Sequence, residues 1–408
     1  MTSVAASTAV VRRAAETRYV AMTGIGLSLI GFWLVLPPVE SRTIAWPIAF
    51  GAAGAAAGLW AVTQGLRKLG WGTAVVAVAC IVLGVAATNS SEAHLEAAID
   101  WGQMVNLMFV FAAPLTFAAV GGMFSERAGV VNIGLEGMML AGAFFGILGA
   151  DKLNSWPLGL LTAIAAGAGL GLIHAFLSIH MRADQIVGGT GINFLALGVT
   201  GYFFIQIYGE NGTPGTGIPE IPDVKLSFLK DIPPDRVGNF LYQAIGHLNL
   251  MIWLMFALLV AASVAMFRTS IGLRLRSVGE HPRAADTVGI SVYKTRYAAV
   301  TLSGMIAALG GAYLSIGYVH SFSENMTAGR GFIGLAALIF GNWRPFGAFG
   351  AALLFGFAGG LATRLQEYGY GVQVLVQALP YVLTLIAVAG VIGRSIPPAS
   401  VGRPYVKQ

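Results

Sequence analysis

The sequence predicts an all-α polytopic membrane protein. Its 408 residues are 56% hydrophobic and only 10% charged, whereas an average soluble chain carries roughly 25% charged residues. The mean hydropathy is +0.74. The apolar residues occur in long runs that approach the roughly 20 residues a helix needs to cross a bilayer. Helices also satisfy their own backbone hydrogen bonds in lipid, which favours this fold class over irregular chain.

Twelve apolar segments follow one another along the chain, and we expect most of them to be membrane spans. The tenth is too short to cross alone and is flanked by glycine, so it is expected to be a broken or re-entrant helix shielded by its neighbours. The segments are 20–37, 45–66, 71–88, 104–123, 131–149, 156–179, 186–208, 247–267, 296–318, 331–342, 347–363 and 372–393.

The basic residues between these segments predict the orientation of the chain. In the twelve-segment count they all fall on one side, so both termini are expected to be cytoplasmic. The opposite loops hold Glu92, Glu96 and Asp100, and a segment at 209–246 rich in Pro and Gly, which we expect to be an ordered external loop or a short lid. The basic residues are Arg12, Arg13, Arg18, Arg67, Lys68, Arg127, Arg182, Arg268, Arg274, Arg276, Arg283, Lys294, Arg296, Arg394, Arg403 and Lys407.

The stretch 128–142, AGVVNIGLEGMMLAG, predicts a polar core around which other spans pack. It places Asn132 and Glu136 one helical turn apart on one face. An ionisable group at membrane depth usually faces protein or a water-filled path. Small residues nearby let another backbone approach closely. Packing seams of this small-xxx-small type are expected at Gly142 and Gly146, Ala307 and Gly311, and Gly356 and Gly360.

The same stretch takes part in a weak internal repeat. Residues 128–135 align with residues 328–335, with matches at Ala, Gly, Ile, Gly and Leu. The two copies start on opposite sides in the predicted topology, which is the pattern of an inverted repeat with the substrate path between its halves. Chance matching of common residues is the alternative.

Further polar residues within spans are candidates for a substrate path. Thr190 and Asn193 follow or lie within the glycine-rich GGTG, and Gln373 and Gln377 share a helix face in the last span. Asn, Gln and Thr can hydrogen-bond a sugar or nucleoside without adding charge. The alternative is that these side chains bond to backbone or join helices, and that Glu136 pairs with Arg127 or caps a broken helix.

Several functions find no support in the sequence. There is no phosphate-binding loop of the form GxxxxGK[ST], so the chain alone is not expected to hydrolyse ATP. The six histidines lack metal-ligand spacing, and no Ser/His/Asp constellation stands out. The single cysteine, Cys80, has no partner within the chain for a disulfide. No basic patch with interleaved aromatic residues indicates nucleic acid. We therefore expect no metal or cofactor in this chain.

The basic loop 268–296, RTSIGLRLRSVGEHPRAADTVGISVYKTR, predicts a short helix. Pro282 suits the first turn of such a helix, and Gly289 suits its end. A compact helix in a basic loop is a suitable docking element for a cytoplasmic partner. The alternative is an orientation signal with an incidental helical turn.

This loop, continued as YAAVTLSGMIAALGGAYLS, resembles the coupling loop of ABC-importer permeases of the ribose and branched-chain amino acid class. PLTFAAVGGMFSERAGVVNIGLEGMMLAGAFFG and ENMTAGRGFIGLAALIFGNWRPFG resemble its nucleoside and simple-sugar branch. The resemblance covers residues 71–395 and implies a core of about ten spans. It leaves residues 1–70 as an extension with two additional spans and residues 396–408 as a cytoplasmic tail.

The resemblance also implies partners: a cytoplasmic ATPase that binds ATP and Mg²⁺, a second permease subunit, identical or not, and an external substrate-binding protein or lipoprotein, all at the plasma membrane. Glu280, Ala284, Ala285 and Gly289 fall in the ATPase-coupling element. The implied cargo is a nucleoside or simple sugar, with branched-chain amino acids or other small polar solutes as the alternative. Two alternative functions lie outside this class. One is an ion-coupled secondary transporter that uses Glu136 as proton carrier, and the other is a membrane scaffold without transport.

Overall fold

A computed structural model describes residues 2–35, 43–89, 100–209, 212–214, 217–365 and 396–407. The chain divides into two compact units. The first comprises residues 1–104, 230–244 and 362–393, and the second comprises residues 105–229, 245–361 and 394–408. The expected last span, 372–393, lies outside the described residues, as do Gln373 and Gln377.

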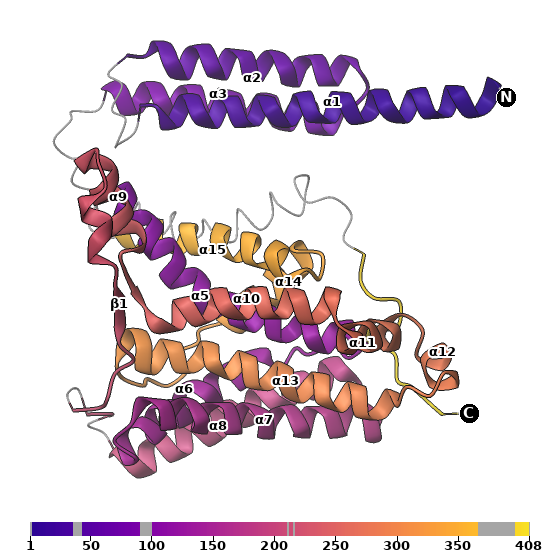
Figure 1. Cartoon of the computed structure of the whole chain (residues 1–408), viewed down its shortest axis with the longest axis vertical. Coiled ribbons are helices and arrows are strands. Elements are labelled where there is room, and N and C mark those ends of the chain that lie inside the picture. The colour runs from indigo at the N-terminus through magenta and orange to yellow at the C-terminus, as the bar shows by residue number, and fades with distance from the viewer. Residues whose placement is uncertain are drawn as a thin grey trace. The chain divides into compact units, whose positions relative to one another are not determined.

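The first unit is built mainly from three helices that pack side by side, α1 (Thr2–Trp33), α2 (Ala45–Thr63) and α3 (Arg67–Asn89) (Figure 1). Glycines let these helices approach closely, since a Cβ added at Gly58 would lie 2.7 Å from the carbonyl oxygen of Gly70. The α3 helix contacts both α1 and α2. The predicted division at residue 70 thus falls inside a helix that packs with the extension.

The second unit contains most of the remaining helices, and each expected apolar segment from 104–123 to 347–363 overlaps one of them. Among the described residues of the whole chain, eight helices are long and apolar enough to cross a membrane. The short tenth segment is an 11-residue helix, α14. In order the helices are α5 (Trp101–Arg127), α6 (Leu135–Lys152), α7 (Trp156–Ala175), η1 (Phe176–His180), α8 (Gln185–Tyr208), α10 (Leu250–Arg268), α11 (Ser270–Glu280), α12 (Pro282–Thr287), α13 (Val292–Ala312), η4 (Tyr313–Val319), α14 (Arg330–Phe340) and α15 (Pro345–Leu365).

Helix α6 is the centre of this unit. It packs against α7, α8, α13 and α14, and most of its side chains are buried. The predicted small-residue seams explain the close approach of α6 and α13. A Cβ at Gly142 would collide with the backbone of Ala308, and one at Gly311 would collide with the backbone of Met139. Movement of α6 therefore requires movement of its neighbours, because close-packed helices have no free space to absorb it.

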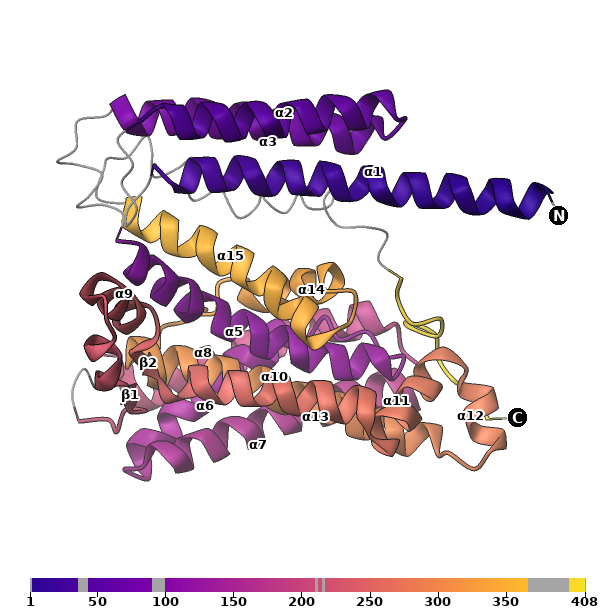
Figure 2. The same cartoon turned by 45° about the horizontal axis from the view of Figure 1, so that its top comes forward.

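The two ends of the second unit differ. At one end β1 (Asp223–Lys225) pairs antiparallel with β2 (His247–Asn249), next to the 3₁₀ helix η3 (Ser227–Asp231). The predicted external segment is thus partly structured, and it continues into α9 (Asp235–Ile245), most of which belongs to the first unit. At the other end lie α11, α12 and residues 396–407 (Figure 2). We call this the α12 end.

Loops that are distant in sequence meet at the α12 end. The Arg296 Nε donates to the Ala128 carbonyl at 3.1 Å, and the Arg127 Nε donates to the Trp343 carbonyl at 3.1 Å. The Tyr297 hydroxyl lies 3.3 Å from the His180 Nδ1. These contacts place the loops after α5, η1 and α14 together with the basic loop 268–296. One end of this unit therefore collects the basic loops that the orientation argument uses.

Candidate functional site

The polar core predicted around Asn132 and Glu136 is a junction of helix ends. Helix α5 ends at Arg127, and Gly129, just beyond it, has φ of +92°. The Gly129 and Val130 amides donate to the carbonyls of Glu126 and Ser125, which is the double bond of a Schellman cap. The chain then runs as a loop, residues 128–134, before α6 begins at Leu135. We call this loop, together with the starts of α6 and α14, the helix junction.

Glu136 holds the start of α14. One carboxylate oxygen accepts from the Thr327 hydroxyl at 2.6 Å and from the Gly329 amide at 2.8 Å. The other accepts from the Gly331 amide at 2.6 Å. Glu136 is only 7% exposed. The first amides of a helix have no partner within it and favour a negative charge. Among the interpretations of Glu136 given above, the cap of a broken helix fits this geometry.

Asn193 on α8 plays the matching part at the start of α6. Its Oδ1 accepts from the Gly137 amide at 2.8 Å, and its Nδ2 donates to the Ile133 carbonyl at 3.0 Å. Gly137 has no room for a side chain, since an added Cβ would lie 2.8 Å from the Asn193 Cα. Thr190, one turn earlier, is exposed and donates to the Ile186 carbonyl at 2.9 Å. Asn193 thus fixes the junction, whereas Thr190 bonds within its own helix.

Asn132 connects the junction loop to α13. It is fully buried, and its Nδ2 donates to the Ser303 hydroxyl at 2.9 Å. Its Oδ1 has no hydrogen-bond partner among the described residues. A buried amide oxygen without a partner costs free energy, which a water or a rearranged neighbour can offset. Asn132 is therefore suited to change partner when α13 moves.

Two buried residues that the sequence analysis did not single out hold the same loop. The Gln185 Oε1 accepts from the Val131 amide at 2.7 Å, and the His174 Nε2 lies 2.9 Å from the Val131 carbonyl. Both residues are almost fully buried, with exposed fractions of 4% for Gln185 and 0% for His174. The sequence signal for this arrangement is small. It consists of polar residues at both ends of the segment 174–185, which leads from α7 to α8. Both backbone groups of Val131 are thereby fixed from α7 and α8.

The predicted short helix is present as α12, with Pro282 in its first turn. It ends in a Schellman cap, because the Gly289 amide donates to Asp286 and the Ile290 amide donates to Ala285. Gly289 has φ of +86°, a conformation that only glycine adopts at little cost. The sequence pattern of an N-terminal proline and a C-terminal glycine therefore predicted this element correctly.

The four predicted coupling residues occupy different positions around α12. Ala284 is exposed, whereas Ala285 is buried among Val278, Val292 and Tyr405. The Glu280 Oε2 accepts from the Ala399 amide at 3.1 Å. An added Cβ at Gly289 would meet nothing within 4 Å. Ala284 and Gly289 thus lie on open surface, while Ala285 attaches α12 to the rest of the unit.

Arg296, one of the basic residues counted in the orientation argument, is buried. It lies in α13, is only 1% exposed, and donates to three groups. These are the Ala128 carbonyl at 3.1 Å, the Arg403 carbonyl at 3.0 Å and the Ser400 hydroxyl at 3.4 Å. The guanidinium carries five donors in a rigid fork, which suits such a linking role. Arg296 joins α13, the junction loop and the C-terminal segment.

The sequence repeat has only partial counterparts in local structure. Gly129 and Gly329 both have positive φ, of +92° and +82°. The helix that follows begins at Leu135 in the first copy and already at Arg330 in the second. Glu136, directly after the first copy, bonds to Gly329 and Gly331 of the second copy. An inverted repeat stays a prediction.

The chain turns sharply between α14 and α15. Asn342 and Trp343 in this turn have positive φ, and α15 starts at Pro345. The Trp343 ring, of a type common at membrane interfaces, is enclosed by protein. It is 4% exposed, and its Nε1 donates to the Glu126 Oε2 at 2.6 Å. Burial of this pair secures the turn to the end of α5.

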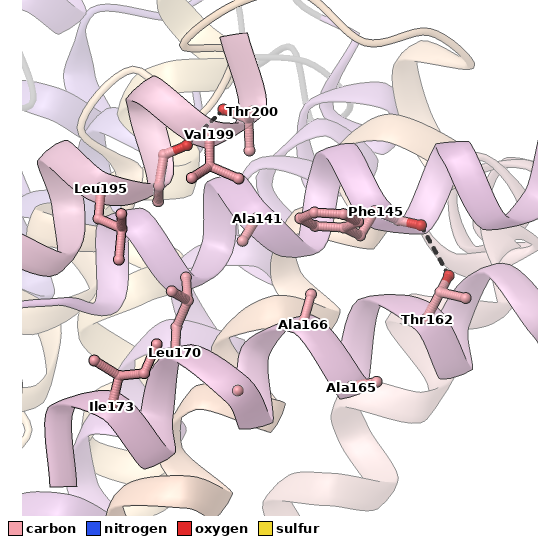
Figure 3. A pocket seen from close by; sticks show the side chains of 12 residues that line it. Ala141, Phe145, Thr162, Ala165, Ala166, Leu170, Ile173, Leu195, Val199 and Thr200 are labelled. Carbon is pink, nitrogen blue, oxygen red and sulfur yellow. Dashed lines mark hydrogen bonds between the residues drawn. The ribbon is translucent and has the colours of Figure 1, made fainter. Parts of the chain in front are cut away.

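An apolar pocket of about 500 Å³ opens between α6, α7 and α8 (Figure 3). Its hydroxyls are already used, because Thr162 donates to the Phe145 carbonyl and Thr200 to the Ala196 carbonyl, each at 2.8 Å. The remaining wall consists of aliphatic residues, glycine and the ring of Phe145. Such a wall offers no free hydrogen-bonding side chain to the hydroxyls of a sugar or nucleoside.

Comparison with known proteins identifies the family to which the chain belongs. Residues 104–388 match the family described as branched-chain amino acid transport system, permease component. The chain is 45% identical over 314 residues to the guanosine ABC transporter permease protein NupQ of Bacillus subtilis, covering 74% of this chain and 96% of the relative. It is 38% identical over 312 residues to the nucleoside ABC transporter permease protein NupC of Lactococcus lactis, covering 74% and 95%.

A third relative is the putative glucose ABC transporter permease protein TsgC13 of Haloferax volcanii, 34% identical over 269 residues, with 65% of this chain and 78% of the relative covered. No solved structure matches the chain. The family match covers more than half of the chain and includes the helix junction and α12. The chain is therefore a multi-pass membrane protein of the branched-chain amino acid transport system permease family.

Proposed function

We propose that this chain is a permease subunit of an ATP-driven importer of nucleosides. The observation that carries the proposal is the likeness to two nucleoside permeases, which extends over nearly their whole length. A glucose-type relative at lower identity makes simple sugars the second candidate. The hydrolytic step belongs to a separate cytoplasmic ATPase that binds ATP and Mg²⁺. A second permease subunit and an external binding protein complete the importer.

In this proposal α12 is the element that meets the ATPase, and the α12 end is cytoplasmic. A helix fixed at both ends, by Pro282 and by the Gly289 cap, can transmit a displacement without bending. The displacement passes through Arg296 to the junction loop and from there to the start of α6. Because Glu136 on α6 holds α14, the two discontinuous helices move together. ATP can shift the populations of the importer's conformational states only if the contacts between α12 and the ATPase differ between those states.

The geometry of the helix junction also disfavours the alternative function, a secondary transporter driven by an ion gradient. That transporter requires Glu136 to release and rebind a proton along a path. Here both carboxylate oxygens are occupied by donors from α14 and the segment before it. A capping role accounts for this carboxylate without a proton path. The predicted path residues Asn132 and Asn193 likewise serve the junction, so substrate selection is assigned chiefly to the external binding protein.

Uptake of labelled guanosine into proteoliposomes tests this function. The vesicles contain the permease, its second subunit, the ATPase and the binding protein, with and without ATP on the ATPase side. Uptake that requires ATP and is lost in Ala285→Asp and Gly289→Asp, with the subunits still assembled, is expected. Uptake that follows a proton gradient and ignores ATP would overturn the proposal. ATP-driven uptake of glucose but not of guanosine would move the chain to the sugar importers.

A further inference from the structure

The C-terminal segment 396–407 folds back over α12, although it lies beyond the family match, which ends at residue 388. The Ser400 amide donates to the Gly279 carbonyl at 2.9 Å, and the Ala399 amide donates to Glu280 at 3.1 Å. The Tyr405 ring is 7% exposed and packs against Tyr293 with centroids 5.7 Å apart. We call residues 396–407 the C-terminal strap.

The strap is attached firmly rather than resting on the surface. Burial, together with a hydrogen bond to Asp286 on α12, raises the pKa of the Tyr405 phenol. The Lys407 Nζ lies 3.9 Å from the Asp286 Oδ1. Arg296, inside α13, donates to the strap at the Arg403 carbonyl and the Ser400 hydroxyl. The strap, α12 and the start of α13 therefore form one structural element.

A cleft of about 570 Å³ separates the strap from α12. The exposed guanidinium groups of Arg283 and Arg403 lie on opposite walls, one on α12 and one on the strap. Among the described residues neither makes an ion pair within 4.0 Å. One wall is formed by residues 280–284 and the other by Ala399, Ser400, Arg403, Pro404, Tyr405 and Val406.

The cleft lining also holds one carboxylate, Glu280, one oxygen of which accepts from the Ala399 amide. The two arginines are its only basic side chains of permanent charge among the described residues. Exposed valines lie both at the end of α12 and on the strap. Val288, at the end of α12, is 75% exposed, and Val406 on the strap is 47% exposed. A loop that only marks orientation has no need to expose valines beside unpaired arginines. The combination of exposed valines with two arginines that have no ion-pair partner fits a protein partner that presents an acidic side chain beside an apolar surface.

We propose that the C-terminal strap forms the second wall of the ATPase docking site, and that Arg283 and Arg403 bind a carboxylate of the cytoplasmic ATPase in the cleft. This rests on the proposed function, in which α12 meets the ATPase. The cleft is continuous with the open surface of α12 at Ala284, so one partner can cover both. Through Arg296, the same partner would also act on the junction loop.

Charge reversal of Arg403 tests the proposal. Its side chain is exposed, and the bonds that hold the strap use its backbone, so Arg403→Glu is expected to fold. Binding of the co-expressed cognate ATPase to the permease in nanodiscs is measured at low and physiological salt. We expect the affinity to fall by about tenfold or more at low salt, because a charge pair becomes a repulsion. The control is Arg274→Glu, an exposed basic residue of α11 outside the cleft, with an expected loss below about threefold.

Cysteine labelling gives a second readout that does not depend on charge. In a Cys80→Ser background, Val406→Cys lies in the cleft, whereas Ile396→Cys lies on the strap outside it. Bound ATPase is expected to slow maleimide labelling at 406 and to leave 396 unchanged. An ATPase that binds with wild-type affinity to Arg403→Glu and leaves 406 unprotected overturns the strap proposal and leaves the importer intact. A wild-type permease that binds no ATPase overturns both.

Discussion

Replacing Glu136 with glutamine tests the role of the helix junction directly. The carboxylate accepts three hydrogen bonds, from Thr327, Gly329 and Gly331. A glutamine amide has one acceptor oxygen, and its NH₂ group would face a donor. At least one bond to α14 is therefore lost and the charge at the helix start disappears. A hydrogen bond to a charged group contributes about 1.5–3 kcal/mol, so the expected loss of stability is about 2–4 kcal/mol.

The melting temperature of the purified permease in detergent measures this loss. A change of this size corresponds to a decrease on the order of 5–10 °C for a unit of this length. The control is Glu324→Gln, the same substitution at an exposed position in the segment that leads to α14. Thr327→Val completes a double-mutant cycle with Glu136→Gln, with a coupling of about 0.5–3 kcal/mol expected for groups in contact. Equal melting of the Glu136 and Glu324 variants would refute the capping role.

Three further substitutions probe the junction, the coupling helix and the packing of α15. Asn193→Ala removes both bonds that hold the start of α6, and we expect a loss of about 1–3 kcal/mol in the same melting assay, whereas Thr190→Ala on the same helix should change little. Gly289→Ala meets no atom but forces alanine to φ of +86°; this strain of about 1–2 kcal/mol should lower ATP-driven uptake more than it lowers the amount of assembled complex. Gly356→Leu would collide with the backbone of α5 at Met108, so chromatography should show disturbed assembly before uptake assays show altered selectivity, and normal assembly with altered selectivity would contradict this.

The sequence predicted the elements well because each depends on local patterns. Runs of apolar residues predicted the positions of most described helices, including the short α14, and Pro282 with Gly289 predicted both ends of α12. These signals act within a turn or two of helix, so they survive without knowledge of tertiary contacts.

The partners of the polar residues depend on tertiary contacts and escaped prediction. Glu136 bonds to residues almost 200 positions away, and sequence reasoning left its cap and path interpretations open. Arg296 looked like one more basic residue of a cytoplasmic loop, yet its partners are Ala128, Ser400 and Arg403. Tryptophan is common at membrane interfaces, but the Trp343 ring is buried and donates a hydrogen bond to the buried Glu126. No periodicity encodes which distant backbone group a buried side chain meets.

The ratio of nucleoside transported to ATP hydrolysed tests most directly whether Arg296 links the coupling helix to the helix junction. In proteoliposomes with all partner subunits, wild type is compared with Arg296→Met, with Arg274→Met as the exposed control. The account predicts that Arg296→Met, where it assembles, keeps basal ATP hydrolysis and loses most guanosine uptake, because its bonds to the junction loop and the strap are gone. A ratio equal to that of wild type would contradict it.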